Sequence, residues 1–420
     1  MTTVPQSIAA ATEDENKDQP RNPQNQDTDT DTCPSRSRSN AALQTILIGL
    51  SGPSSSGKTT LARLLRTIFD FEIAVPVGVP STKAGQPEVT DVHDGREQQQ
   101  QQPSLTHGSN GQTQEEGSWC RWKVTLFVLH EDDFYKTDKD VPVATVSSPE
   151  NGTRDLLDWD CIESLDLPLL ENTLRHVHDH GTLPPDTLSK EDQNAIGPID
   201  ISDEEVERIK REVKEWFERT IRSITASASL ECAGKVDAFQ SDPYEKEIRI
   251  CVLDGFLLYS EPPGSEVKST GSGSGSASGS GSGSASTSGS GSASASSISL
   301  LAHLHTISRT LLDRRLFLPV TRDQMLRRRL ARMGYVTLEG FWVDPPGYVE
   351  DVVWPHYARD HSWMFVNGDA DACLFDENKC KEHQIDVCPG QGRWRLREVL
   401  DWAVEKVEET VVEKLRSETS

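Results

Sequence analysis

The sequence predicts an α/β fold in which a parallel sheet is flanked by helices, and two observations carry this prediction. Short runs of β-branched and other apolar residues alternate along the chain with segments of helical periodicity, the pattern of a parallel sheet. A glycine-rich stretch, GPSSSGKT at 52–59, follows the first apolar run and precedes the first helical segment. That order of strand, glycine-rich loop and helix is typical of α/β proteins that bind phosphate groups.

Four apolar runs predict the strands. They are LQTILIGL (43–50), WKVTLFVL (122–129), EIRICVLDGFLL (247–258) and RLFLPV (315–320). Four segments with apolar residues at helical spacing predict helices. They are TTLARLLRTIF (59–69), ISDEEVERIKREVKEWFERTIRSI (201–224), RDQMLRRRLARMG (322–334) and WRLREVLDWAVEKVEETVVEKL (394–415). Ser202 followed by Glu205 resembles a capping box at the start of the second helix.

Three biased segments lie outside this pattern. Residues 1–43 are polar and predict a disordered N-terminal tail. Residues 75–118, with five consecutive Gln at 98–102, predict an insertion loop. A second insertion is expected at about 262–299, where Gly, Ser, Ala and Thr dominate and favour a flexible coil. Residues 44–420 are therefore expected to form one domain carrying two low-complexity insertions.

The composition limits the partners of the chain. Its 420 residues include 43 Lys and Arg and 67 Asp and Glu, giving a formal net charge of −24. Broad binding to nucleic acid or to an anionic membrane needs a basic footprint, so we expect neither. No secretory signal and no apolar run of membrane-spanning length is found. The eight cysteines contain no C-x-x-C pair, which favours free thiols in a reducing compartment, cytoplasmic or also nuclear.

The stretch 52–59 satisfies the pattern G-x-x-x-x-G-K-[ST] of a P-loop. Its glycines would let backbone N–H groups converge on phosphate oxygens at the positive end of a helix. Lys58 would reach the β- and γ-phosphates, and the Thr59 hydroxyl would face Mg²⁺. A serine- and glycine-rich turn is the alternative, but both flanking elements favour a P-loop NTPase. A GTPase is disfavoured because no N-K-x-D segment is present; a motor or AAA-type ATPase stays open.

Acidic residues follow two of the predicted strands. LHEDDFYK (129–136) comes after the second strand, and Asp254 lies where the third strand ends. Ligands of α/β sheets bind at the carboxyl ends of the strands, so these acids are expected near the P-loop. Alternation along a strand would place Asp132 and Asp133 on opposite sides. The pattern does not say which of the two faces the loop.

Arginines gather in the predicted helix 322–334. Arg328 and Arg332 are four residues apart and Arg329 and Arg332 are three apart, so the three share a helix face. A solvated basic face is the alternative. Arginine concentrated in an acidic chain, directly after the fourth strand, favours an Arg-rich lid over a triphosphate.

Several blocks together resemble the nicotinamide riboside kinases, particularly the fungal form, a branch of the uridine kinase-like P-loop kinases. They are ILIGLSGPSSSGKTTLA, HEDDFYK, DWDCIESLD, VLDGFLLYS, RRRLARMGYVTLEGFWVDPPGYVEDVVWPHY and FVNGD. They occur in the family's order and cover roughly half of the chain. The resemblance implies that residues 44–420 form a P-loop kinase domain.

The resemblance also implies roles for individual residues. Asp132 would accept the proton of the ribose 5′-hydroxyl, with Lys58 as the second catalytic residue, and Glu131 would be a dispensable neighbour. The ATP-binding set would be Gly52, Ser54, Ser55, Ser56, Gly57, Lys58, Thr59, Thr60, Arg328 and Arg332. The substrate-binding set would be Asp132, Asp133, Phe134, Tyr135, Trp159, Asp160, Arg329 and Tyr335. The Mg²⁺ ligands would be Thr59, Asp132 and Asp254.

Two aromatic positions agree with a cationic substrate. Trp159 and Tyr335 match those that would face a nicotinamide ring, and ordinary core packing is the alternative. A pyridinium gains about 0.5–2 kcal/mol from each favourable aromatic face. The expected activity is ATP-dependent phosphorylation of nicotinamide riboside, and also of nicotinic acid riboside, in NAD salvage. A uridine/cytidine kinase and a non-catalytic ATP-binding scaffold are the alternatives.

Overall fold

The computed structural model describes residues 42–77, 118–231, 244–260 and 295–417, except for residues 188, 190–193, 195–196, 198, 333 and 338–339. The predicted tail lies outside the described residues up to residue 41. Most of both predicted insertions, 78–117 and 261–294, lies outside them as well.

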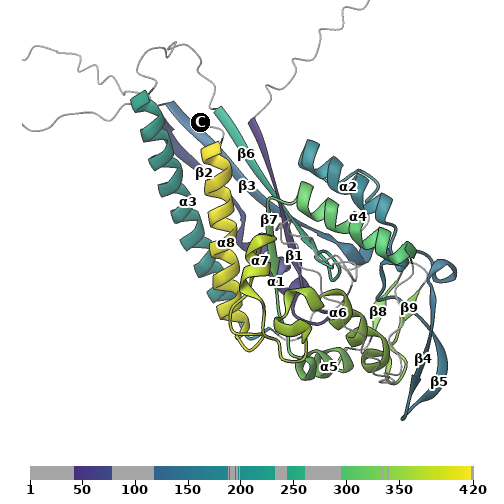
Figure 1. Cartoon of the computed structure of the whole chain (residues 1–420). Helices are drawn as coiled ribbons and strands as arrows, with labels where there is room; N and C mark the ends of the chain where they lie inside the picture. The colour runs from purple at the N-terminus through teal and green to yellow at the C-terminus, as the bar shows by residue number, and fades with distance from the viewer. Residues whose placement is uncertain are drawn as a thin grey trace, which may run out of the picture. The chain divides into compact units, whose positions relative to one another are not determined.

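A six-stranded sheet with the order β10-β7-β1-β6-β3-β2 forms the centre of the fold (Figure 1). In chain order its strands are β1 (Ala42–Ser51), β2 (Asp70–Val77), β3 (Ser118–His130), β6 (Tyr244–Asp254), β7 (Arg314–Phe317) and β10 (Ile385–Val387). Every neighbouring pair is parallel except β2 and β3, which are antiparallel. The prediction of an α/β protein is confirmed, while the sheet, predicted to be parallel, is mostly parallel because β2 runs antiparallel to β3.

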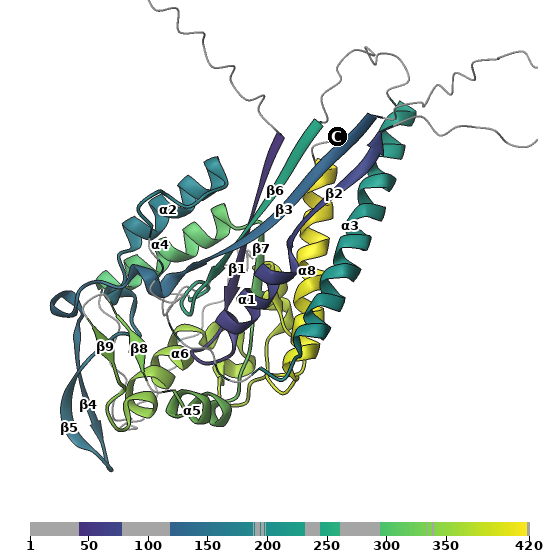
Figure 2. The ribbon, with the colours of Figure 1, turned by 180° about the vertical axis from the view of Figure 1, so that it is seen from behind.

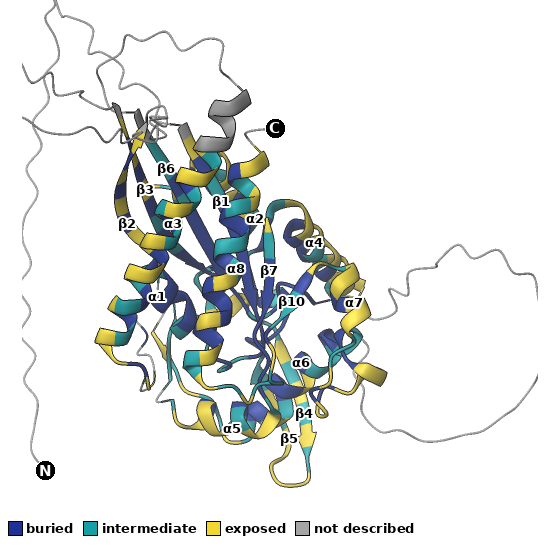
Figure 3. Ribbon diagram, turned by 90° about the vertical axis from the view of Figure 1, so that its left-hand side faces the viewer, coloured by how far each residue is buried: buried dark blue, intermediate teal, exposed yellow. Residues whose placement is uncertain are grey.

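Helices cover both faces of this sheet (Figures 1 and 2). One face packs against α1 (Lys58–Ile68), α3 (Asp203–Glu231) and α8 (Leu396–Ser417). The other face packs against α2 (Leu167–His180) and α4 (Ala295–Leu311). Alternate residues of β1 divide between the two cores, with Ile46 and Ile48 on the first side and Leu47 on the second. This two-sided burial explains why the strands are continuous apolar runs in the sequence (Figure 3).

Short elements gather beyond the carboxyl ends of the central strands (Figure 1). These elements are the helix α5 (Arg322–Leu330) and the hairpins β4 (Val143–Ser148) with β5 (Gly152–Leu157) and β8 (Tyr335–Val336) with β9 (Phe341–Trp342). The remaining helices are α6 (Trp354–Asp360) and α7 (Glu377–Glu382). The carboxyl end of the sheet is therefore the end that carries the short helices and hairpins.

The edges of both insertions differ from the prediction. β2 extends to Val77 and β3 begins at Ser118, so strands enter the segment 75–118 at both ends. α4 begins at Ala295, so the last residues of the segment 262–299 are helical. The sequence pattern did not indicate β2 because a proline lies within it. β2 is an edge strand paired only with β3, and an edge strand tolerates proline.

The predicted capping box is confirmed. The Ser202 hydroxyl accepts from the Glu205 backbone N–H at 3.3 Å, and the Glu205 carboxylate accepts from the Ser202 N–H at 3.2 Å. The two bonds satisfy donors that a helix start leaves unpaired. They fix the first turn of α3, the longest helix described.

Phe217 of α3 is an anchor of the first core. Its side chain is 1% exposed and contacts Phe71 and Trp122 edge-on, with ring centroids 5.7 and 5.8 Å away. We expect Phe217→Ala to lower the free energy of unfolding by about 3–5 kcal/mol because it leaves a cavity. Urea denaturation measures the loss. Leu169→Ala, at a 51% exposed position, is the matched control and should change stability by under about 0.5 kcal/mol; equal losses would contradict the assignment.

Two general predictions can be compared with the described residues. Within those residues, no helix combines the length and apolarity needed to cross a membrane. The six cysteines that the structure describes are buried free thiols. The expectation of unpaired cysteines is therefore confirmed for these six.

Candidate active site

A cavity of about 860 Å³ opens at the carboxyl ends of the central strands. Its size falls within the range of small-molecule sites. Of the residues predicted for the site, those that line it are Ser54, Ser55, Ser56, Gly57, Lys58, Thr59, Thr60, Asp132, Tyr135, Trp159, Asp160, Asp254, Arg328, Arg329, Arg332 and Tyr335. The structure does not bring Gly52, Asp133 or Phe134 to its lining.

The loop 52–59 connects β1 to α1 and forms the floor of the cavity. Gly52 and Gly57 have φ angles of 148° and 105°, a region that disfavours other residues. A Cβ atom at Gly52 would lie 2.3 Å from the Leu318 carbonyl oxygen. Glycine therefore shapes the loop, while Gly57 caps the positive end of α1 and directs it at the cavity.

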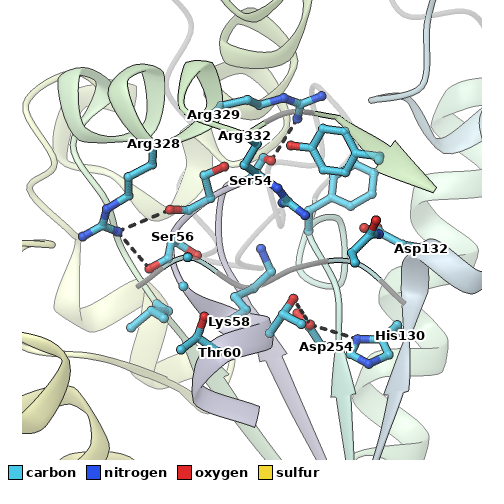
Figure 4. Close-up of a pocket in the computed structure, with 18 of the residues that line it drawn as sticks. Ser54, Ser56, Lys58, Thr60, His130, Asp132, Asp254, Arg328, Arg329 and Arg332 are labelled. Carbon is cyan, nitrogen blue, oxygen red and sulfur yellow. Dashed lines mark hydrogen bonds and ion pairs between the residues drawn. The ribbon is translucent and has the colours of Figure 1, made fainter. Parts of the chain in front are cut away.

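Lys58 is buried at the first position of α1. Its Nζ donates to the carbonyl oxygens of Gly52 at 2.9 Å and Pro53 at 3.1 Å. Burial lowers the pKa of its ammonium group, against the opposing attraction of Asp254 and Asp132. The ammonium group thus lies beside the loop backbone, on the same side of the cavity as Asp254 (Figure 4).

A hydrogen-bonded group of three joins α1 to the ends of β3 and β6. The Thr59 hydroxyl donates to Asp254 Oδ2 at 2.6 Å, and His130 Nδ1 lies 3.1 Å from the same oxygen. Burial alone would raise the pKa of Asp254, but the hydrogen bond from His130 and the charge of Lys58 hold it below its usual value. Asp254 is therefore an ionised carboxylate at the cavity floor. Sequence reasoning did not identify His130, although it is a polar residue at the end of an apolar strand.

The acidic run does not continue the strand. Residues Glu131–Phe134 form a 3₁₀ turn, so the prediction that strand alternation separates Asp132 from Asp133 is wrong in its reasoning. The turn still separates them, because Asp132 lines the cavity and Asp133 does not. Phe134 is 4% exposed and packs in the second core. The structure places only Asp132 of this run where it can meet a ligand.

Glu131, which the resemblance implied to be a dispensable neighbour, is a buried residue with two hydrogen bonds. Its side chain is 0% exposed, and its Oε2 accepts the backbone N–H groups of Phe256 at 2.6 Å and Leu257 at 3.1 Å. Burial raises its pKa to about 7 even though both backbone bonds favour the ionised form. A buried carboxylate with these contacts ties two segments together rather than facing solvent.

The predicted helix 322–334 ends earlier, because α5 stops at Leu330, so Arg328 and Arg329 lie on the helix and Arg332 lies just beyond its end. The three arginines therefore do not share a helix face, and their contacts differ. Arg328 Nη1 donates to the carbonyl oxygens of Ser55 at 3.3 Å and Ser56 at 3.2 Å. The Arg332 guanidinium carbon lies 4.1 Å from the ring centroid of Tyr335. All three arginines lie along one side of the cavity, opposite Lys58 and Asp254 (Figure 4).

Arg329 is the buried member of the three. It donates to Asp344 through Nε at 2.7 Å and Nη2 at 3.1 Å, a paired geometry that holds the guanidinium rigidly. Its Nη1 lies 2.9 Å from the Ser54 hydroxyl and 3.4 Å from Asp160 Oδ1. Burial would lower its pKa, but Asp160 and Asp344 hold it well above the usual value. Arg329 therefore bridges the loop 52–59 and the opposite end of the cavity.

That opposite end is aromatic. Trp159 is 5% exposed, with the Tyr135 ring edge-on at 5.3 Å and the Trp342 ring at 5.9 Å between centroids. Trp342 pairs with Tyr335 across the β8–β9 hairpin, and its Nε1 donates to Asp344 at 3.0 Å. Sequence reasoning did not assign Trp342 or Asp344, although both lie in the block GFWVDPPGYV. The cavity thus has a polar floor, formed by the loop 52–59 and Asp254, and an aromatic end.

The fold and the cavity define an α/β protein with a ligand site at the carboxyl edge of a parallel sheet. The chain is similar to nicotinamide riboside kinases of three fungi. It is 26% identical to that of Schizosaccharomyces pombe over 368 residues, 87% of this chain and 96% of the relative. Identity is 24% over 338 residues (80% and 86%) for Saccharomyces cerevisiae, and 21% over 327 residues (78% and 80%) for Eremothecium gossypii. No family model matches the chain. The resemblance that the sequence blocks indicated is confirmed.

Proposed function

We propose that this chain is a P-loop kinase that transfers phosphate from ATP to the ribose 5′-hydroxyl of nicotinamide riboside, and also of nicotinic acid riboside. One observation carries the proposal. A single cavity joins the loop 52–59, Asp132 and an aromatic end, in a chain similar to three nicotinamide riboside kinases along most of its length. Residues 44–420 would form the kinase domain.

The donor phosphates belong at the loop 52–59. Backbone N–H groups at the start of α1 and the Lys58 ammonium group supply positive charge there. Lys58 donates to its own loop carbonyls, so binding would exchange those acceptors for phosphate oxygens. Arg328 and Arg329 of α5, with Arg332 just after it, would act as a lid that neutralises charge developing on the transferred group.

The residues at the floor fit a magnesium ion. Thr59 offers a hydroxyl, and Asp254 and Asp132 offer carboxylates. Mg²⁺ bound with substrate phosphates needs only one or two carboxylates. When bound, the ion would neutralise phosphate charge. Asp132 would accept the proton of the attacking 5′-hydroxyl and orient that oxygen.

The aromatic end suits a pyridinium ring. Trp159, Trp342 and Tyr335 offer π faces or edges around one space, and Asp160 lies where ribose hydroxyls would reach it. Arg332 covers the Tyr335 ring in this structure. Stacking of a substrate on that ring requires Arg332 to move, and the triphosphate supplies the negative charge to attract it. We therefore expect donor and acceptor to bind cooperatively.

A substrate panel tests the proposal. Purified protein with Mg·ATP is assayed against nicotinamide riboside, nicotinic acid riboside, uridine and cytidine. We expect kcat/KM for nicotinamide riboside to exceed that for uridine by about tenfold or more, the equivalent of about 1.4 kcal/mol of cation–π attraction. Equal or better turnover of uridine would replace the substrate with a pyrimidine nucleoside. No turnover of any nucleoside, with ATP still bound, would favour a non-catalytic scaffold.

A further inference from the structure

Glu131 is a buried group that the proposed mechanism leaves without a role. It follows the last residue of β3 and precedes Asp132. Its Oε2 accepts two consecutive backbone N–H groups, those of Phe256 and Leu257. Gly255 packs against the same carboxylate so closely that a Cβ atom there would lie 2.7 Å from Oε2. The carboxylate is therefore held by two N–H donors and fits only because residue 255 has no side chain.

These contacts begin where the sheet ends. His130 and Asp254 are paired in the register of β3 and β6, and they are the last residues of their strands. Beyond them, the register of β3 and β6 has no further backbone pair. The Gly255 N–H donates to Leu50 O at 3.1 Å, which ties the β6 end to β1. Glu131 supplies the corresponding tie between β3 and β6.

The residues on either side of this tie are the two acids of the site. Asp132 follows Glu131 directly, and Asp254 precedes the Gly255–Leu257 turn that Glu131 holds. Asp254 is also held by its bonds to Thr59 and His130, and Glu131 adds a bond between the turn that carries Asp132 and the turn that follows Asp254. Misplacement of a reacting group by about 1 Å can cost 10²-fold in rate. A rigid tie at this point would therefore act on catalysis without touching a ligand.

We propose that Glu131 is a positioning residue that holds Asp132 in register with Asp254 through the backbone of Phe256 and Leu257. The inference deepens the proposed function and rests on it for the catalytic consequence. The contact needs an acceptor oxygen rather than a charge. An amide oxygen can accept the same two bonds, so the Glu131→Gln variant should keep the contact. The Glu131→Ala variant should lose it.

Steady-state kinetics of Glu131→Ala and Glu131→Gln test the proposal. For Glu131→Ala we expect kcat to fall about 10–100-fold while KM for ATP and for the nucleoside stays within about threefold. Glu131→Gln should stay within about threefold of the unmodified protein in every parameter. Asp376→Ala is the matched control, because Asp376 also accepts two consecutive N–H groups, those of Asn378 and Lys379, but on α7 away from the cavity. It should lower Tm without changing kcat.

Gly255→Ala perturbs the same contact from the other side. The new methyl group would displace the Glu131 carboxylate, so kcat should fall in the unmodified background. In the Glu131→Ala background the added effect should be smaller, because the displaced carboxylate is already gone and only the contact with the Leu258 side chain remains. Additive losses in the double variant would contradict a shared mechanism.

Amide hydrogen exchange keeps this test separate from the proposed function. Phe256 and Leu257 should be protected in the unmodified protein and in Glu131→Gln, and should exchange faster in Glu131→Ala. If the unmodified protein phosphorylates no nucleoside, the proposed function fails and the exchange data still decide whether the tie exists. Unchanged protection in Glu131→Ala, or a kcat in Glu131→Gln as low as in Glu131→Ala, would overturn the proposal. A lower Tm with unchanged kcat in Glu131→Ala would reduce Glu131 to a structural residue.

Discussion

Replacing Asp132 with asparagine is expected to lower kcat by about 10³-fold, within the 10²–10⁴-fold range of general acid–base catalysis. The amide has the shape of the carboxylate but cannot accept the proton of the 5′-hydroxyl. Asp132 lies on a 3₁₀ turn at the end of a buried strand, so the substitution should leave the fold intact. Kinetics with nicotinamide riboside and Mg·ATP measure the loss, and calorimetry should show that ATP and nucleoside still bind.

Asp133 is the matched control, because it has the same chemistry one position further along the turn. It does not line the cavity, so Asp133→Asn should keep kcat within about threefold of the unmodified protein. A large loss in Asp133→Asn together with an active Asp132→Asn would assign the base to Asp133. Equal, small losses in both variants would mean that neither carboxylate accepts the proton.

The central strands could be predicted because burial on both faces forces long apolar runs. The runs at 43–50 and 122–129 correspond to β1 and β3, each strand being longer than its run. β2 and β10 could not be predicted in this way. β2 lies at the edge and contains a proline, and β10, Ile385–Val387, has three residues. Strands so short or so exposed carry no periodic signal above the surrounding sequence.

The parts of the site that could be predicted are those that local sequence encodes. The loop 52–59 is local, since its spacing, its preceding strand and its following helix are all visible in the sequence. The partners of Glu131 and His130 lie 125 and 124 residues away, and Asp160 lies 169 residues from Arg329. No local pattern encodes such contacts. Helix periodicity predicted three arginines on one face, but α5 ends before Arg332. Periodicity also could not show that Arg329 is buried against Asp344 while Arg328 donates to loop carbonyls.

Substitution of Lys58 by methionine should give the second large effect, a fall in kcat of about 10²–10³-fold, the cost of removing one preorganised donor to developing charge. Methionine has similar length and fills the same space. Lys58 contacts the loop carbonyls rather than the aromatic end, so the affinity for nicotinamide riboside measured without ATP should stay within about twofold. Lys379→Met, on the exposed face of α7, is the matched control and should behave as the unmodified protein.

We expect Lys58→Met to lower kcat strongly while changing the free energy of unfolding little. The lysine is 8% exposed, and burial already lowers the pKa of its ammonium group, which means that desolvation opposes the charge. Removing one partner of a buried ion pair is costly when it leaves the other charge uncompensated, but removing Lys58 also removes the desolvation cost of its own charge. Asp254 keeps its bonds to Thr59 and His130 and so remains compensated. We expect the free energy of unfolding to change by under about 1 kcal/mol; a larger loss would show that Lys58 holds the loop together and that part of the activity loss is structural.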